Sequence, residues 1–427
     1  MSFNVGRICR YCMATHGDIK RCFNESDFVL RTADVHRYHL ECVKENPDTK
    51  AIYGVTGGCP FDKLDYFDVT MSLPPDVMHD FLEGVVPLVL RLVLSKAHRE
   101  KVITIQEFNE ELRKLTIGQN DKKNKPAPLS EKLLRSCSIV GSASQKWCLF
   151  RLLPFLVAHR IPEGCSYWHV YLLCREISDI VMAPAVKKEW LPTLDLLVSE
   201  FLSCSVKEFG DVLTPKCHYL IHYSRLMLCY GPLRSLWCLR FEGKHQYFKQ
   251  VASTCRNFNI SSTLSNRHQH RQCWELSSVN MLGEYERVAG CCVSTPFRSL
   301  PVALQHSVKA NKKYSHVNFE GKQLQRVTEV VLNDVKYCVK DVFTVGHLHA
   351  EAVPLFFQIK YILNIDTDWL LCGKLLIPVS FCRHFYSYCV KCENEWTVLL
   401  PGEEVDYQAL DTYHVDDKLF ISTRYNC

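Results

Sequence analysis

Two histidines and a group of charged residues in the middle of the chain recur at helical spacing. His218 and His222 stand at i and i+4, so on a helix both imidazoles face the same way, as two ligands of one metal ion must. Further along, Glu242, His245 and Lys249 fall on one face of a second predicted helix. A carboxylate among cations could bind a divalent ion and leave the cations free for phosphate groups.

The other flank of that second helix is apolar. Phe241, Phe248 and Val251 lie on it, and this pattern predicts that the flank faces a hydrophobic core. A core helix whose polar face is merely solvated would have the same sequence, and composition alone favours that interpretation over a metal site.

Two cysteines near the N-terminus have the spacing of metal ligands. Cys9 and Cys12 form a Cys-x-x-Cys, which suits a zinc knuckle, a redox pair or chance. No strand–helix pattern surrounds the pair, so a thioredoxin-like redox site is the least favoured of the three. His36 and His39 follow and could complete a local zinc site, although their spacing differs from that of standard zinc fingers.

Length and composition limit the classes of protein to which this chain can belong. The 427 residues are enough for two or three domains, and 47% hydrophobic and 23% charged residues are ordinary for a globular protein. The net charge of +5 does not by itself indicate a nucleic-acid partner. The 23 cysteines are scattered and odd in number, which favours reduced intracellular thiols over a disulfide scaffold. No secretory signal is evident, and the longest apolar run, residues 85–94, is too short to span a bilayer, so we expect no membrane partner.

The region before the first strongly apolar helix contains a second set of candidate ligands. Residues 64–70 alternate between polar and apolar side chains, which predicts a short strand. Paired prolines then open a helix whose apolar residues recur at helical spacing, so that helix should be largely buried. Asp76 and His79 share a face at its start. An aspartate there is commonly only a helix cap, and both interpretations stay open.

The remaining segments indicate a helical part followed by a β-rich part. Residues 103–115 predict an amphipathic helix, residues 119–130 an exposed basic loop, and residues 144–228 a helical block. Residues 276–320 have the composition of a linker. Residues 321–427 are short β-rich runs between turn residues, typical of a small barrel or sandwich.

A polar stretch after the second predicted helix is rich in arginine and histidine. It contains Arg256, Arg267, His268, His270 and Arg271. Such a cluster could follow a phosphate backbone, although a solvated surface is the commoner meaning of a run of this kind.

Several separate motifs agree with one known family. In chain order they are CRYC, PPDVMHDFLEGV, LTPKCHYLIHY and LRFEGKHQYFKQV, followed by RNF and LSNRHQ. Over residues 2–275 the chain closely resembles the animal CACTA (EnSpm-type) transposases, which usually continue into a β-rich tail. The resemblance implies an α/β (α+β) fold with an RNase H-like core, a large helical insertion and a small all-β, barrel-like C-terminal domain. It also implies two-metal DNA strand cleavage and transfer by three carboxylates.

The resemblance assigns roles to acidic residues and their neighbours. Glu242 matches the last catalytic carboxylate of the family. Asp76 and His79 match an Asp-x-x-His motif, in which the aspartate is the second carboxylate or supports it. The resemblance implies that His79 and His245 support the catalytic carboxylates. The cations that we expect to contact DNA are Arg240, Lys244, Lys249, Arg256, Arg267 and Arg271.

The resemblance also favours one long-range zinc site. Cys9 and Cys12 together with His218 and His222 match an arrangement shared with Transib-type transposases and the antigen-receptor recombinase. There a Cys-x-x-Cys and a later histidine pair bind one structural zinc across the insertion. We therefore prefer this set to the local alternative with His36 and His39, which their positions alone leave open.

The chain departs from the family pattern at its start. Relatives have a strand, a Gly-Asp-Asn segment and an earlier catalytic aspartate before the CRYC motif, whereas this sequence begins after all three, as an N-terminal truncation would. The expected domains are a zinc-knuckle segment with a remnant of the RNase H-like core, a helical insertion with the Glu242 helix, a linker and a β-rich domain. Their expected bounds are residues 1–80, 81–275, 276–320 and 321–427.

These observations predict a nuclear, transposase-derived DNA-binding protein, domesticated from a transposon and without catalysis. DNA is the expected partner, structural zinc the expected cofactor, and the resemblance allows a homo-oligomer. One alternative is an active transposase that uses Mg²⁺ or Mn²⁺ and whose N-terminal segment is missing from this sequence. Another is a decaying gene fragment without function.

Overall fold

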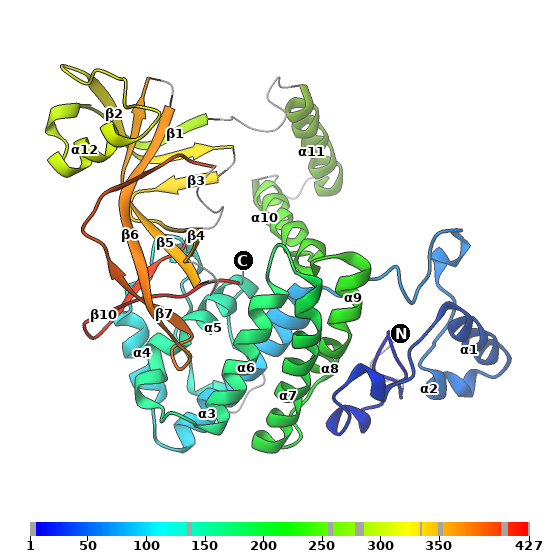
Figure 1. Ribbon diagram of the computed structural model, residues 1–427. Coiled ribbons are helices and arrows are strands. Elements are labelled where there is room, and N and C mark those ends of the chain that lie inside the picture. The colour runs from blue at the N-terminus through cyan, green and yellow to red at the C-terminus, as the bar shows by residue number, and fades with distance from the viewer. Residues whose placement is uncertain are drawn as a thin grey trace. The chain divides into compact units, whose positions relative to one another are not determined.

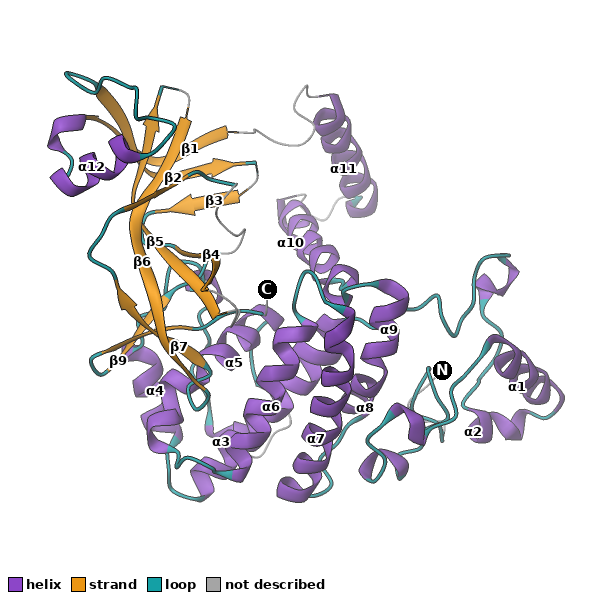
Figure 2. Cartoon of the chain, viewed as in Figure 1, coloured by secondary structure: helices purple, strands orange, loops and turns teal. Residues whose placement is uncertain are grey.

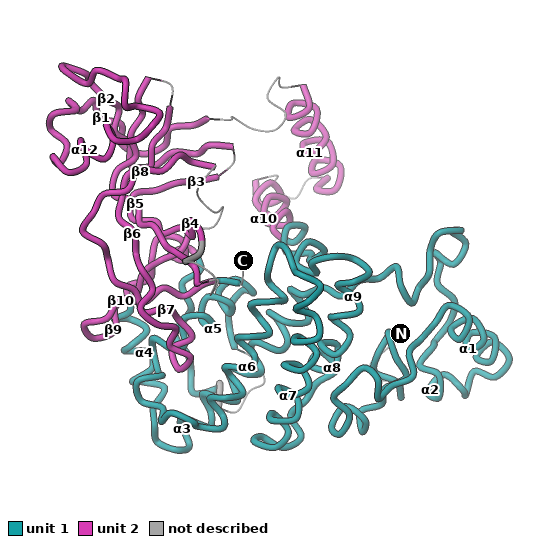
Figure 3. Tube along the Cα trace, in the orientation of Figure 1, with its two compact units in different colours: residues 1–115, 124–242, 424–427 teal, residues 116–123, 243–423 magenta. Residues whose placement is uncertain are grey.

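The computed structural model divides into two compact units. The first contains residues 1–115, 124–242 and 424–427, and the second contains residues 116–123 and 243–423 (Figure 3). Helices dominate the first unit and antiparallel strands the second, so the expected α+β class is confirmed (Figures 1 and 2). The structure describes residues 6–134, 139–254, 259–277, 286–333, 335–348, 353–366, 368–402 and 409–425.

The first unit begins with loops and short helices. Helix α1 spans Ala33–Glu45 and α2 spans Lys50–Tyr53. Up to residue 134, the described residues of this unit form only isolated bridges, such as Cys12 with Leu30, and no sheet. The remnant of an RNase H-like core that the resemblance implies therefore has no mixed sheet in the described part of this segment.

The short strand expected over residues 64–70 is wrong. These residues form turns instead. The Asp68 carboxylate accepts hydrogen bonds from the backbone N–H and the hydroxyl of Thr70, at 2.8 and 2.7 Å. Such local side-chain bonds compete with an extended backbone, and polar–apolar alternation does not reveal them.

A helical block follows, as expected. Most of α6 is buried, where Trp168 stacks on Tyr171 with ring centroids 4.4 Å apart. Capping boxes at Thr104 and Ser142 begin α4 and α5, which explains why these helices start where the periodicity predicts. The helices are α3 (Val86–Arg99), α4 (Ile105–Lys114), α5 (Ala143–Val157), α6 (Ser166–Val181), α7 (Leu191–Phe209), α8 (Pro215–Tyr219) and α9 (Tyr223–Tyr230).

The predicted helix after the paired prolines is present, but its first turns are π-helical. This segment, η5, spans Met78–Val85 and runs directly into α3. Phe81 and Val85 are fully buried, as their spacing predicts. Wide turns of this kind frequently occur at functional sites because they re-aim side chains within a helix.

The second unit contains a ten-stranded antiparallel sheet. The main path of neighbours is β1-β2-β5-β6-β7-β10-β9, with β3 on β2, β4 on β5 and β8 on β6. Among the described strands β1 and β9 end the path, so these pairings do not show a closed barrel. The strands are β1 (Glu286–Pro296), β2 (Gln323–Leu332), β3 (Val335–Cys338), β4 (Val342–Leu348), β5 (Val353–Ile365), β6 (Asp368–Cys382), β7 (Ser387–Cys392), β8 (Thr397–Leu399), β9 (Thr412–Val415) and β10 (Lys418–Ile421).

Much of the segment expected to be a linker belongs to this folded unit. Strand β1 pairs with β2 along its length, and helix α12 (Val302–Ala310) follows it. Leu304 and Val308 of α12 are buried in a cluster with Leu363 of β5. The basic residues of the segment suggested an exposed linker. Its few apolar residues lie on one side of a short helix, however, and their burial makes the segment part of the folded unit.

Helices α10 (Leu239–Thr254) and α11 (Ile260–Ser277) follow the helical block in the chain and precede the strands of the sheet. No residue of α10 is buried, and Phe241 is 74% exposed, so the core-facing flank that we predicted is wrong. Phe248 contacts His268 of α11, with ring centroids 5.3 Å apart, and such a two-helix contact covers only part of each ring. Within the described residues, no helix is both long and apolar enough to cross a membrane.

Candidate metal centre and carboxylate cluster

The predicted long-range ligand set comes together inside the first unit. Cys9 and Cys12 lie in the N-terminal loops, His218 on α8, and His222 at the end of the short turn Leu220–His222. One ligand atom from each residue lies within 4.8 Å of all the others, and all four residues are buried. The fold thus joins two pairs that are more than 200 positions apart.

The distances agree with a single tetrahedral ion. Cys9 Sγ lies 3.4 Å from His222 Nε2, and Cys12 Sγ lies 3.2 Å from His218 Nε2. Sulfur and nitrogen atoms bound to one tetrahedral zinc are about 3.6 Å apart. Two thiolates and two imidazoles are also the donor set that closed structural zinc sites use. The residues present therefore fit zinc.

Outer residues orient the ligands of this centre. Glu25 accepts a 2.6 Å hydrogen bond from His222 Nδ1, which turns the Nε2 atom toward the thiols, and Arg225 donates to the same carboxylate. Buried Arg31 donates from Nε to the carbonyls of Cys9 and Cys12, and its charge interacts with both cysteines. A carboxylate behind a ligating histidine and a cation near thiolates both favour metal binding.

Burial and mutual hydrogen bonds shift the pKa values of three of the ligands. Burial alone would raise the pKa of Cys9, but hydrogen bonds with Cys12, His218 and His222 hold that pKa well below its usual value. The hydrogen bond to Cys9, together with burial, raises the pKa of Cys12. Burial would lower the pKa of His222, but hydrogen bonds with Cys9 and Glu25 raise it.

The local alternative ligands lie elsewhere. His36 and His39 are on α1, where His39 stacks on Tyr53 with ring centroids 4.3 Å apart. Neither belongs to any of the three groups of converging ligand atoms found in the described part of the chain. The long-range set is therefore the one that the fold brings together.

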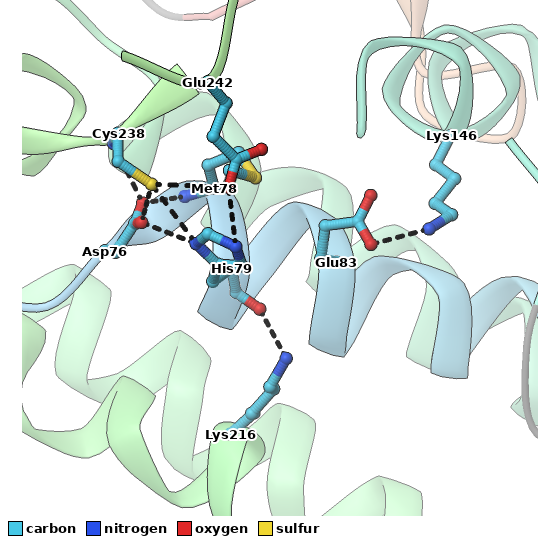
Figure 4. A network of polar contacts seen from close by, with 8 residues as sticks. All are labelled: Asp76, Met78, His79, Glu83, Lys146, Lys216, Cys238 and Glu242. Carbon is cyan, nitrogen blue, oxygen red and sulfur yellow. Dashed lines mark hydrogen bonds and ion pairs between the residues drawn. The ribbon is translucent and has the colours of Figure 1, made fainter. Parts of the chain in front are cut away.

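A second cluster forms around His79. Its Nδ1 atom lies 2.7 Å from Asp76 Oδ2, and its Nε2 atom lies 3.1 Å from Glu242 Oε1 (Figure 4). The two predicted catalytic carboxylates thus meet at one imidazole. Asp76 also bonds to the start of the helix, because its Oδ1 atom accepts a hydrogen bond from the backbone N–H of Met78. Both interpretations of Asp76 are compatible with this geometry.

A cysteine that sequence reasoning missed completes the cluster. The Cys238 thiol donates to Asp76 and lies 3.3 Å from His79 Nδ1. Burial and the carboxylates of Asp76 and Glu242 raise the pKa of this thiol to about 12. Its position four residues before Glu242 was the available signal, since i and i+4 share a helix face. Mg²⁺ prefers oxygen ligands, so a thiol and an imidazole between the carboxylates fit that ion poorly.

The π-helical segment is held in place from two sides. Lys216 of α8 donates a 2.8 Å hydrogen bond to the carbonyl of His79, and the nearly buried Lys146 of α5 forms a 2.8 Å ion pair with Glu83 (Figure 4). A side chain at Gly84 would place its Cβ only 2.4 Å from Lys216 Cδ, so glycine lets α8 approach. These contacts fix the backbone that carries Asp76 and His79.

Asp80 should make stability depend on pH. It is 7% exposed, its Oδ2 atom has no hydrogen-bond partner, and burial raises its pKa to about 6. Unfolded aspartate ionises near pH 4, so the folded state keeps this proton longer and loses stability as pH rises from about 4 to 6. Asp80→Asn should therefore gain about 2 kcal/mol relative to the unmodified chain between about pH 4.5 and 7.

Amide hydrogen exchange along η5 and α3, corrected for intrinsic rates, measures this difference at the two pH values. Asp34→Asn is the control, because the Asp34 side chain is 88% exposed. An equal pH dependence in Asp80→Asn and the unmodified chain would contradict the prediction.

The expected DNA-contacting cations lie on α10 and α11. Arg240, Lys244 and Lys249 are exposed on α10, as is His245, and Arg267 is exposed on α11. Arg271 of α11 is already engaged, since it forms a 2.6 Å ion pair with Glu275 and lies over the ring of Tyr247. Arg256 lies outside the described residues.

Comparisons with known proteins add no relative. Neither the family models, nor the curated proteins, nor the solved structures contain a match to this chain.

Proposed function

We propose that this protein is a transposase-derived DNA-binding protein of the CACTA type that does not cut DNA. The observation that supports the proposal most is that Asp76 and Glu242 both contact His79. The family motifs that contain these two carboxylates are recognised from the sequence alone, so their contact in the fold is independent support. The convergence of Cys9 and Cys12 with the later histidine pair supports the same origin. We infer that the metal in that closed centre is zinc.

The finer features of the fold belong to the same proposal. They are a relationship of the first unit to the RNase H-like core with its helical insertion, and a barrel-like form for the sheet of the second unit. Nuclear localisation belongs to the same proposal because the protein would bind chromosomal DNA. A homo-oligomer would be inherited from the ancestral transposase, which must hold two DNA ends.

Exposed cations on α10 and α11 would contact the phosphate backbone. Lys244, Lys249 and Arg267 lie on turns of these helices with their side chains in solvent. Each phosphate contact releases counterions and contributes about 0.9 to the slope of log K against log salt concentration. The triple alanine variant should therefore bind mixed-sequence duplex DNA with a slope smaller by about 2.7.

Fluorescence anisotropy across a range of salt concentrations measures that slope. The control variant replaces three other exposed lysines, Lys44, Lys63 and Lys122, and so changes the net charge equally. If both variants lose the same slope, binding is non-specific attraction to a basic protein and the proposed surface is wrong. If the unmodified chain does not bind DNA, the proposed function itself is wrong.

The absence of catalysis is tested separately. His79 and the Cys238 thiol lie against the Asp76 and Glu242 carboxylates, and this set of donor atoms suits Mg²⁺ poorly. We therefore expect no nicking when the chain is incubated with Mg²⁺ or Mn²⁺ and DNA that carries terminal repeats. Nicking that Glu242→Ala abolishes would establish the alternative, an active transposase.

A further inference from the structure

The cluster around His79 has the donor atoms of a transition-metal site. Asp76 Oδ2, His79 Nδ1 and Cys238 Sγ all lie within 4.8 Å of one another. They are one oxygen, one nitrogen and one sulfur, a set that suits zinc or cobalt and does not suit Mg²⁺. Figure 4 shows the three side chains pointing toward a common point from the start of η5 and from the segment that leads into α10.

The orientation of the imidazole supports this interpretation. His79 Nε2 lies 3.1 Å from Glu242 Oε1, so it can donate there and leave the Nδ1 lone pair facing Asp76 and Cys238. A carboxylate that accepts from the far nitrogen of a ligating histidine is the usual outer contact in zinc sites. In that tautomer a cation between Nδ1 and Asp76 Oδ2 relieves the repulsion of two acceptors that are 2.7 Å apart.

The backbone holds the three ligands together before any ion arrives. The N–H of Cys238 donates to Asp76 Oδ1 at 3.3 Å, which connects residues that are 162 positions apart. Lys216 fixes the carbonyl of His79. Asp76 Oδ2 lies 2.7 Å from His79 Nδ1 and 2.5 Å from Cys238 Sγ. Ligands on one ion are about 3.3–3.6 Å apart, so these atoms must spread slightly when an ion binds. The His79 side chain is 48% exposed and has room to do so.

We propose that Asp76, His79 and Cys238 form a second, open site for a thiophilic divalent cation of the zinc class, oriented by Glu242. Three protein ligands leave one coordination position for water or an anionic group, unlike the closed centre at Cys9 and Cys12. The site rests on these contacts alone and does not depend on DNA binding.

Cobalt titration of the full chain, first loaded with one equivalent of zinc, tests the proposal. Cobalt bound by a thiolate has a sulfur-to-metal charge-transfer band, which reports the Cys238 ligand directly. We expect one further equivalent with this band, unaffected by a large excess of Mg²⁺. Cys238→Ser should abolish the band, and Glu242→Gln should weaken binding by about 10–100-fold.

Cys229→Ser is the matched control, because Cys229 is an exposed free thiol on α9 in the same unit. His79→Ala provides a second test that does not alter a thiol and should also remove the further equivalent. Circular dichroism shows whether each variant is folded. A charge-transfer band that persists in Cys238→Ser, or no further cobalt equivalent in the folded unmodified chain, would overturn the proposal.

Discussion

Replacing Cys12 by serine should weaken zinc binding at the closed centre by about 100-fold. Four ligands of a structural zinc site together provide about 10–16 kcal/mol at neutral pH, so one ligand accounts for about 3 kcal/mol. Because a bound ion would connect the N-terminal loops to α8, the variant should also expose the N-terminal segment to limited proteolysis. The Lys20–Asp211 and Glu25–Arg225 ion pairs remain, so the loosening should be partial.

Competition with a chromophoric chelator measures the affinity, and mass spectrometry of protease fragments locates the opened segment. Cys22→Ser is the control, since Cys22 is a nearby free cysteine outside the ligand group. If Cys12→Ser and Cys22→Ser retain equal zinc affinity, the centre does not use Cys12.

Zinc uptake should also release protons. The raised pKa of Cys12 means that this thiol holds its proton at neutral pH without metal, and it must lose that proton to become a ligand. Binding should therefore weaken as pH falls. Calorimetry in buffers of different ionisation enthalpy should show release of about one proton or more.

Replacing Glu83 by alanine should destabilise the first unit by about 3 kcal/mol. Lys146 is 8% exposed, and its ammonium lies 2.8 Å from the Glu83 carboxylate. Removing the carboxylate leaves a buried charge without its partner, which is among the most costly single changes in a core. The loss should be greatest in η5, whose backbone carries His79.

The double variant Glu83→Ala/Lys146→Met should recover most of that stability, because an apolar side chain of similar length needs no counterion. Urea unfolding together with hydrogen exchange along η5 and α5 measures both variants. Asp34→Ala is the control, since its ion pair with Arg37 is exposed and should cost less than about 1 kcal/mol. A small effect in Glu83→Ala, or a double variant no more stable than Glu83→Ala, would show that Lys146 does not need this partner.

Much of the local structure follows from the sequence by itself. Capping residues and 3.6-residue periodicity predict α4 and α5, and β-rich runs between turns predict most strands of the second unit. These signals are local, and the physics behind them acts within a few residues. The same locality explains the errors. Asp68 bends a segment that alternates like a strand, and α12 buries its apolar side only because a sheet lies beside it.

Both the sequence and the tertiary structure were needed to identify the candidate sites. Residue types and spacing identified the Cys-x-x-Cys, the histidine pair, Asp76 and Glu242 as groups able to bind metal, since ligand chemistry is a property of the side chains. Only the tertiary structure decided which groups meet. It joined Cys12 to His218 and placed Cys238 beside Asp76 and His79, because packing of distant helices fixes distances that no short-range pattern encodes.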